Sequence, residues 1–246
     1  MKKGFWQSEW QNINFDSLGV PLKFFSVPGS EFYESFYTEL FRRYEGYDAL
    51  PKKWKEEKYK TAVTINEIIK DATSILSVGC GLGFVEKSLI DINKKLEIDA
   101  FDFANNANKW LLDIDSVNCI TSIDDEKKYQ FIYCTQLLYA LSDKEISDFS
   151  KFIKNHLIEG GIFLTVDTSL NASENSDNES HVHNFLWGRL RNILALIYFF
   201  IFKRGKIQFW GWQRDNIEII QKFHLDGMVL TKKIKAVGQS FLIFRI

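Results

Sequence analysis

The sequence has few cysteines, no excess of either charge and no long apolar run. Three cysteines are an odd number and cannot all pair, so we expect reduced thiols in a reducing compartment. The formal net charge is −1, which argues against a nucleic-acid partner because phosphate binding needs a concentrated basic face. A lysine cluster within 52–60, diluted by Glu56 and Glu57, is typical of a solvated helix face.

The absence of a long apolar run limits how the chain can meet a membrane. The longest run, 193–202, is about half of the roughly 20 residues that a spanning helix needs. Residues 1–10 contain no apolar run of the length found in secretory signals, so we expect a cytoplasmic protein. Two interpretations of 193–202 stay open. It is a lid helix docked on the protein, or a peripheral segment that flanking Arg, Lys, Trp and Phe side chains seat at the inner face of a membrane.

Residues 75–83 are the most informative stretch of the chain. The apolar residues of 75–78 predict a short buried strand, which ends in glycines at 79, 81 and 83. An apolar helical pattern follows from Phe84. A strand, a glycine turn and a helix together present backbone N–H groups and a helix N-terminus to a nucleotide-like ligand. Each glycine either avoids a collision with that ligand or permits a positive φ angle.

A carboxylate follows at the distance that such a ligand requires. Residues 96–103 alternate in the manner of a second strand, which closes on Asp102, nineteen residues after Gly83. A carboxylate there can accept both ribose hydroxyls of a nucleotide. Asp99 is a competing acid, but it lies inside the strand and on its other face. A structural alternative for Asp102 is the N-cap of a helix over 105–112.

The spacing of the glycines separates two classes of nucleotide site. A dinucleotide fingerprint needs a small residue at position 84, where this chain has Phe84, so an NAD-dependent oxidoreductase is a weaker alternative. The spacing G-x-G-x-G resembles motif I of the class I S-adenosylmethionine (SAM) methyltransferases, and among them the small-molecule and glycan methyltransferases. The resemblance covers about residues 60–167, where further strands are expected at 117–123, 129–134 and 162–167. A closing hairpin at 228–246 resembles the family more weakly.

The resemblance implies a fold and a donor site. The fold is α/β, with a doubly wound, mostly parallel seven-stranded sheet, a C-terminal antiparallel hairpin, an N-terminal helical extension and a helical lid insertion. The cofactor is SAM, and its product is S-adenosylhomocysteine. The residues that the resemblance assigns to the cofactor are Gly79, Cys80, Gly81, Gly83, Asp102, Phe103, Ser122, Ile123, Thr135 and Gln136.

The chain departs from the family pattern in two places. Many members have an acidic residue two positions before the first glycine, where this chain has Ser77. Many have Glu-His after the fourth strand, where this chain has Tyr139 and Ala140, which removes a histidine base from that position. The Asn-Pro-Pro-Tyr and Asp-Pro-Pro-Tyr motifs of enzymes that methylate amino groups in nucleic acids do not occur at the end of this strand.

We expect two parts, a helical N-terminal extension or cap at 1–60 and a SAM-binding domain at 61–246 with a lid insertion at 168–214. In the extension, an apolar stripe from Tyr33 to Tyr44 predicts a helix packed over the donor cleft. The insertion opens with the polar residues 171–180, which are typical of a mobile loop.

The candidate catalytic bases for a hydroxyl acceptor are an aspartate and a lid histidine. Asp167 ends the fifth strand, and His181 or His183 lies in the lid insertion. Their structural alternatives are a loop cap for Asp167 and an exposed position for His181. Gln136 and Tyr139 are expected between the donor and the acceptor. We expect no metal, because the histidines lack a nearby cysteine or acidic pair.

These observations predict a SAM-dependent methyltransferase that transfers a methyl group to a small-molecule, glycan or glycolipid acceptor. The tryptophans of the lid favour a glycan, because indole faces suit sugar C–H surfaces, although the same side chains would serve a lipid. The alternative is a non-catalytic module of the same fold, which binds a partner or a membrane surface through residues 185–212.

Overall fold

A seven-stranded sheet forms the centre of the computed structural model, which describes residues 3–69, 71–168 and 207–246. The strands lie in the order β10-β11-β8-β7-β4-β5-β6. Neighbours from β6 to β8 pair in parallel, whereas β11 is antiparallel to both β8 and β10. Their bounds are β4 (Ile75–Val78), β5 (Ile98–Phe101), β6 (Val117–Ile120), β7 (Tyr129–Thr135), β8 (Leu157–Thr168), β10 (Val229–Ala236) and β11 (Gln239–Arg245). The predicted mostly parallel sheet with its C-terminal hairpin is confirmed.

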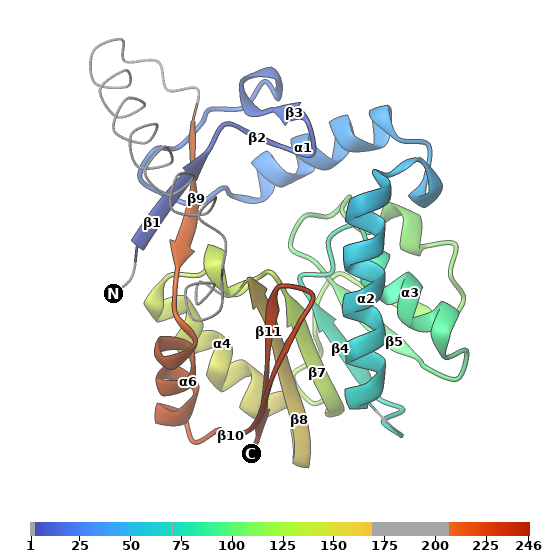
Figure 1. The fold of residues 1–246 in the computed structure, drawn as a ribbon, viewed down its shortest axis with the longest axis vertical. Coiled ribbons are helices and arrows are strands. Elements are labelled where there is room, and N and C mark those ends of the chain that lie inside the picture. The colour runs from blue at the N-terminus through green and yellow to red at the C-terminus, as the bar shows by residue number, and fades with distance from the viewer. Residues whose placement is uncertain (1–2, 70, 169–206) are drawn as a thin grey trace, which may run out of the picture.

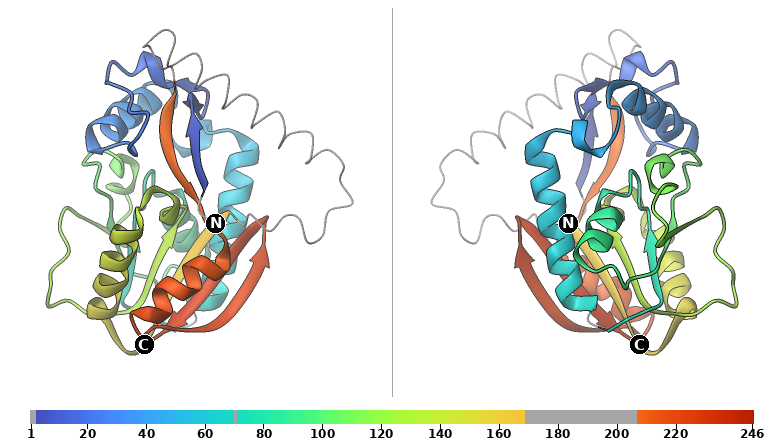
Figure 2. Two further views of the ribbon diagram at one scale, coloured as in Figure 1. Left: turned by 90° about the vertical axis from the view of Figure 1, so that its left-hand side faces the viewer. Right: turned by 90° about the vertical axis from the view of Figure 1, so that its right-hand side faces the viewer.

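Helices cover both faces of this sheet (Figures 1 and 2). On one face, α2 (Lys52–Ile69) and α3 (Phe84–Ile92) share a core with Phe131 and Tyr133. On the other, α4 (Asp143–His156) and α6 (Asn216–Leu225) share a core with Ile132. Successive residues of β7 thus enter opposite cores, as the pleat of a strand requires when both faces are covered. The sheet is doubly wound, as the sequence predicts.

Local sequence signals fix where these helices begin. Ser142 and Glu145 form a capping box at the start of α4, in which each side chain accepts a backbone N–H of the other. Asp215 accepts the N–H of Glu218 at the start of α6. Short 3-10 helices join the larger elements: η1 (Phe15–Ser17), η2 (Tyr47–Ala49), η3 (Lys109–Leu111) and η4 (Leu138–Ala140).

The N-terminal extension is only partly helical. It contains β1 (Lys3–Gln7), β2 (Glu9–Trp10), β3 (Ile13–Asn14) and α1 (Ser30–Arg43), and α2 continues past residue 60 onto the sheet. β1 pairs antiparallel with β9 (Gln208–Gln213), as Figure 1 shows above the sheet. The expectation that 208–213 belongs to a helical lid is therefore wrong, because its aromatic residues pair and pack as a strand. The division at residue 60 stays a prediction.

A third core joins β9 to the N-terminal elements. It contains Phe15, Phe36 and Trp210, with Phe15 stacked on Trp210 at a centroid distance of 5.1 Å. The side chain of Trp210 is only 3% exposed. Trp210, which was expected on the surface of the lid, is therefore a core residue. The remainder of the predicted lid, 169–206, lies outside the described residues.

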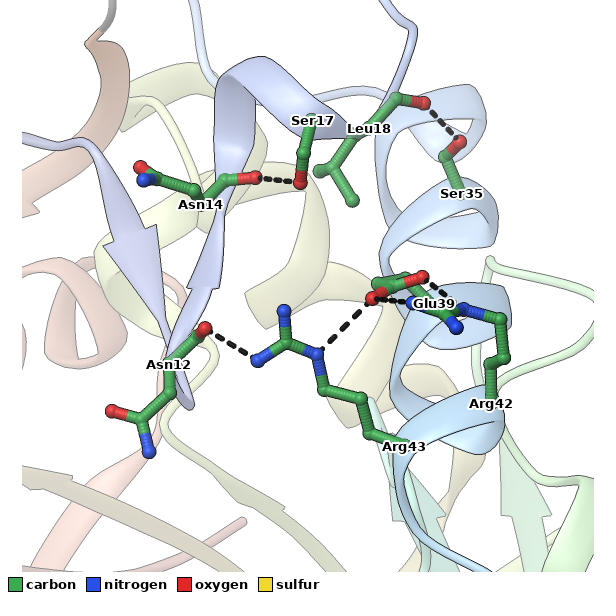
Figure 3. Close-up of polar contacts among 8 residues, drawn as sticks. All are labelled: Asn12, Asn14, Ser17, Leu18, Ser35, Glu39, Arg42 and Arg43. Carbon is green, nitrogen blue, oxygen red and sulfur yellow. Dashed lines mark hydrogen bonds and ion pairs between the residues drawn. The ribbon is translucent and has the colours of Figure 1, made fainter.

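Polar contacts fix α1 to the segment before it (Figure 3). Arg43 donates to the carbonyl of Asn12 at 2.6 Å and to Glu39 at 3.1 Å, and Ser35 donates to the carbonyl of Leu18 at 2.8 Å. Hydrogen bonds from arginine side chains lower the pKa of Glu39 to about 2. These contacts hold α1 and the β2–β3 hairpin together as one layer at the end of the sheet. Across the described ranges, no helix is both long and apolar enough to cross a membrane.

Candidate active site

A cavity of about 910 Å³ lies between the carboxyl ends of the parallel strands and the N-terminal layer. Open α/β sheets bind their ligands at this edge. The cavity is lined from below by residues 79–83, Asp102, Phe103, Thr135, Gln136 and Asp167, and from above by Phe5, Tyr33, Tyr37 and Trp210. The structure therefore brings together all the predicted donor residues except Ser122 and Ile123, which follow β6 and do not line the cavity.

The glycine turn has the backbone that only glycine adopts readily. The φ angles of Gly79, Gly81 and Gly83 are +74°, +54° and +72°. A Cβ atom on Gly81 would lie 2.9 Å from the hydroxyl oxygen of Tyr37, and one on Gly83 would lie 2.1 Å from Cγ of Leu111. The predicted positive φ angles are confirmed. Two of the glycines also admit close packing by the protein itself, which the sequence did not predict.

Asp102 lies beside this turn at the end of β5. Its Oδ2 accepts the N–H of Gly81 at 2.9 Å, and its Oδ1 accepts the N–H of Ala104 at 2.9 Å. Burial raises the pKa of Asp102, and the two N–H groups oppose that rise. Each carboxylate oxygen has two lone pairs, so each retains one for a ligand in the cavity. Asp99, the competing acid, is instead bonded to Tyr129 and Asn118 and does not line the cavity.

The end of β7 carries a strained residue. Gln136 has a φ angle of +55°, and its N–H donates to the carbonyl of Val166 at 2.8 Å. Non-glycine residues rarely adopt this conformation, and those that do cluster at functional sites. The turn here directs the chain into η4, which brings Tyr139 to the cavity.

Asp167 stands near the end of β8, on the far side of the glycine turn from Asp102. Burial raises the pKa of Asp167 to about 6, while a hydrogen bond from Thr165, the charge of Arg214 and the N–H of Leu138 oppose the rise. The Thr165 hydroxyl donates to Oδ2 at 2.5 Å. A carboxylate with this pKa is ionised at neutral pH and is a stronger base than an ordinary aspartate. The other candidate bases, His181 and His183, lie outside the described residues.

Arg214, which the sequence analysis missed, holds the segment after β7 in place. Its side chain is 2% exposed. It donates to the carbonyl of Leu138 at 2.7 Å, to the carbonyl of Leu141 at 2.6 Å and to Asp143 at 3.0 Å. No local pattern marks this arginine, because its partners are more than 70 residues away.

Three tyrosine hydroxyls, those of Tyr33, Tyr37 and Tyr139, lie on the side of the cavity that faces the N-terminal layer. Tyr139 is hydrogen-bonded to Tyr33, and its ring stacks on Trp210 at a centroid distance of 6.3 Å. Burial raises the pKa of Tyr33 and of Tyr37, and raises that of Tyr139 to about 12. All three therefore stay protonated near neutral pH and offer neutral hydroxyl groups to a ligand.

A carboxylate also stands beneath the glycine turn, although the sequence has Ser77 there. Ser77 donates to Oε1 of Glu86 at 2.6 Å, and Tyr133 donates to the same oxygen at 2.7 Å. Glu86 is buried in α3, and this burial raises its pKa. The following helix thus places a carboxylate next to Ser77, although neither Ser77 nor Glu86 lines the cavity. Only the fold reveals this, since nine residues separate the pair.

Cys80 and Lys58 complete the lining at this end of the cavity. Burial raises the pKa of the Cys80 thiol, which therefore stays protonated. Lys58 belongs to the lysine cluster that the composition assigned to a solvated helix face. For Lys58 that interpretation is wrong, because its side chain is partly buried and lines the cavity.

Solved structures with a similar fold include several methyltransferases. Human N-acetylserotonin methyltransferase in complex with SAM is 13% identical, with 94% of this chain and 61% of that chain covered and a TM-score of 0.53. The mitomycin 7-O-methyltransferase MmcR is 11% identical, with 88% and 57% covered and a TM-score of 0.58. This chain has the class I SAM-dependent methyltransferase fold.

A third structure with this methyltransferase fold is matched over almost its whole length. The glycopeptide N-methyltransferase MtfA, complexed with SAM, is 10% identical, with 77% of this chain and 94% of that chain covered and a TM-score of 0.58. By contrast, the chain spans less than two thirds of MmcR and of the human enzyme. No protein-family model and no curated protein matches the sequence. At these identities the likeness establishes the fold.

Proposed function

We propose that this chain is a SAM-dependent methyltransferase that acts on a small-molecule acceptor. The observation that carries the proposal is the lining of one cavity. The glycine turn and Asp102 stand at one side, Asp167 stands at the other, and an aromatic layer covers both. The structures of similar fold that were solved with SAM support it.

The residues present fit SAM as the donor. The spare lone pairs of Asp102 suit the two ribose hydroxyls. Phe103, which is 46% exposed and lines the cavity, offers a ring for the adenine. The glycine turn leaves room for the ligand to lie against the backbone. When bound, SAM supplies a methyl group on a sulfonium that is already a good leaving group.

The protein's own contribution is to place an acceptor hydroxyl and to take its proton. Asp167 accepts that proton, and the hydroxyl of Thr165 fixes the orientation of its carboxylate. The hydroxyls of Tyr33 and Tyr139 are available to hold a polar group of the acceptor. The aromatic layer excludes water, so that alignment of the two reactants supplies most of the rate enhancement.

The lining favours an acceptor with an aromatic or apolar body and a hydroxyl group. Aromatic side chains supply much of the cavity wall and include Tyr33, Tyr37, Tyr139 and Trp210. Such walls bind planar or apolar ligands, and a few polar groups set their orientation. A glycan or glycolipid acceptor remains a second proposal, supported by Trp212, which also lines the cavity. The non-catalytic alternative relied on 185–212, most of which lies outside the described residues.

Transfer of labelled methyl from SAM to a panel of hydroxylated aromatic molecules, sugars and lipids tests this proposal. We expect labelled product in the aromatic fraction. We also expect Asp167→Asn to lower kcat by about a hundredfold or more, the usual contribution of a positioned base. The control is Glu56→Gln, which changes an exposed carboxylate outside the cavity and should leave kcat unchanged. Full activity of Asp167→Asn would remove Asp167 as the base, and an absence of product from every fraction would refute the acceptor class.

A further inference from the structure

The cavity has two cationic side chains among the residues that the structure describes, Lys58 and Arg214. The guanidinium of Arg214 is already engaged by two carbonyls and a carboxylate. Lys58 makes no hydrogen bond or ion pair within the described ranges. Its ammonium lies 5.9 Å from the centroid of the Trp54 ring, which is a weak contact. Lys58 is therefore the cation that remains available to a ligand.

The position of Lys58 is fixed by its helix. Thr61, one turn later in α2, is hydrogen-bonded to Gln239 at 3.0 Å, and Gln239 pairs with Thr168 at the end of β8. This part of α2 thus stands on the β8 and β11 side of the glycine turn. Asp102 stands on the opposite side, at the end of β5. A ligand whose ribose is held by Asp102 and which crosses the turn therefore extends toward Lys58.

An isolated ammonium in a partly buried position calls for an anion. Burial lowers the pKa of Lys58, and the charges of Glu86 and Glu57 oppose this shift, although neither residue forms a hydrogen bond or ion pair with it in the described ranges. A partner carboxylate would satisfy the ammonium and hold it in its charged form. Because the cavity limits access of water, that pairing is stronger than one on the surface.

We propose that Lys58 binds the α-carboxylate at the methionine end of SAM. This inference rests on the proposed function, because it assumes that SAM is the donor. It adds a contact that the proposed function does not include. The amino-acid end of the donor is bound by α2, whereas the contacts proposed above all come from the glycine turn and the strand ends. Lys58 and Asp102 then hold the two ends of the donor, and the glycine turn lies between them.

Calorimetric titration with two ligands tests the assignment. S-adenosylhomocysteine carries the carboxylate, whereas decarboxylated S-adenosylhomocysteine retains the amine and the nucleoside and lacks it. For Lys58→Met we expect a loss of affinity for S-adenosylhomocysteine of about tenfold to a hundredfold, the range for a hydrogen bond to a charged group. Affinity for the decarboxylated ligand should stay within about twofold, since the lost partner is absent from it. Lys58→Arg should recover most of the affinity for S-adenosylhomocysteine.

The matched control is Lys60→Met, which removes an exposed lysine from the same helix. It should leave both affinities unchanged. If Lys58→Met weakens both ligands equally, or neither, the carboxylate assignment is overturned. If Lys58→Met does not fold, Lys58→Gln replaces it in the same comparison. Failure of the unaltered protein to bind either ligand would instead refute the proposed function.

Discussion

The carboxylate of Asp167 makes the stability of this protein depend on pH in a characteristic way. The ordinary pKa of an aspartate is 3.8, and burial raises that of Asp167 to about 6. The folded protein therefore retains this proton at pH values where the unfolded chain has lost it. The associated stability is present at low pH and is lost as the pH rises from about 4 to above 6.

The size of this effect follows from the rise in pKa. Each pKa unit corresponds to about 1.4 kcal/mol, so ionising Asp167 in the folded state costs at most about 3 kcal/mol, because the side chain is only partly buried. Asp167→Asn removes the ionisation and keeps the shape. We predict that, between pH 4.5 and 7.5, the free energy of unfolding of the unaltered protein falls by about 1–2 kcal/mol relative to that of Asp167→Asn, because part of the effect is already present at pH 4.5.

Urea unfolding followed by circular dichroism at several pH values measures this difference. The comparison uses the slope of the free energy of unfolding against pH. The amide introduced by Asp167→Asn accepts one hydrogen bond fewer than the carboxylate, but this cost is the same at every pH and does not change the slope. The two variants should diverge most steeply near pH 5. Parallel curves from pH 4.5 to 7.5 would refute the reasoning, because they would show that Asp167 has an ordinary pKa and is not adapted as a base.

Two further substitutions test the packing of the site and the tuning of its base. Gly83→Ala combines a positive φ angle with a Cβ atom 2.1 Å from a leucine side chain, whereas Gly160→Ala has a similar φ angle of +73° and open space. In urea unfolding, we expect Gly83→Ala to cost at least about 2 kcal/mol more than Gly160→Ala; equal costs would exclude the clash. Thr165→Val removes a hydrogen bond that stabilises the ionised form of Asp167, the proposed base, so the acidic limb of kcat/KM should move up by about one pH unit. A limb that stays in place or moves down would contradict this role of Thr165.

The half of the candidate site formed by the glycine turn and Asp102 was predictable because its signals are local. The glycine turn at 79–83 requires positive φ angles whatever packs on it, and Asp102 ends the next strand along the chain. The alternation of strands and helices over the same stretch predicts parallel pairing, although it does not fix the order of the strands. Asp167 was likewise predictable from its place at the end of a strand. In each case the position of the residue could be inferred from a motif or strand only a few tens of residues away in the sequence.

The rest of the candidate site, which includes the N-terminal layer above the cavity, depends on contacts between distant parts of the sequence. β1 and β9 lie about 200 residues apart, and neither shows by itself that the other will pair with it. For this reason Trp210 was expected on a lid and is found in a core. Lys58 lies in a stretch whose mixed charges are typical of a surface helix. Only the packing of α2 beside the glycine turn brings Lys58 to the cavity. Arg214 and Glu86 were missed for the same reason.

Calorimetric titration with S-adenosylhomocysteine tests the central claim most directly. We predict heat of binding for the unaltered protein and a loss of affinity of at least about tenfold for Asp102→Ala. Asp99→Asn, an acid of the same strand that does not line the cavity, should bind as the unaltered protein does. An unaltered protein that gives no heat, or an Asp102→Ala variant that binds equally well, would contradict the account.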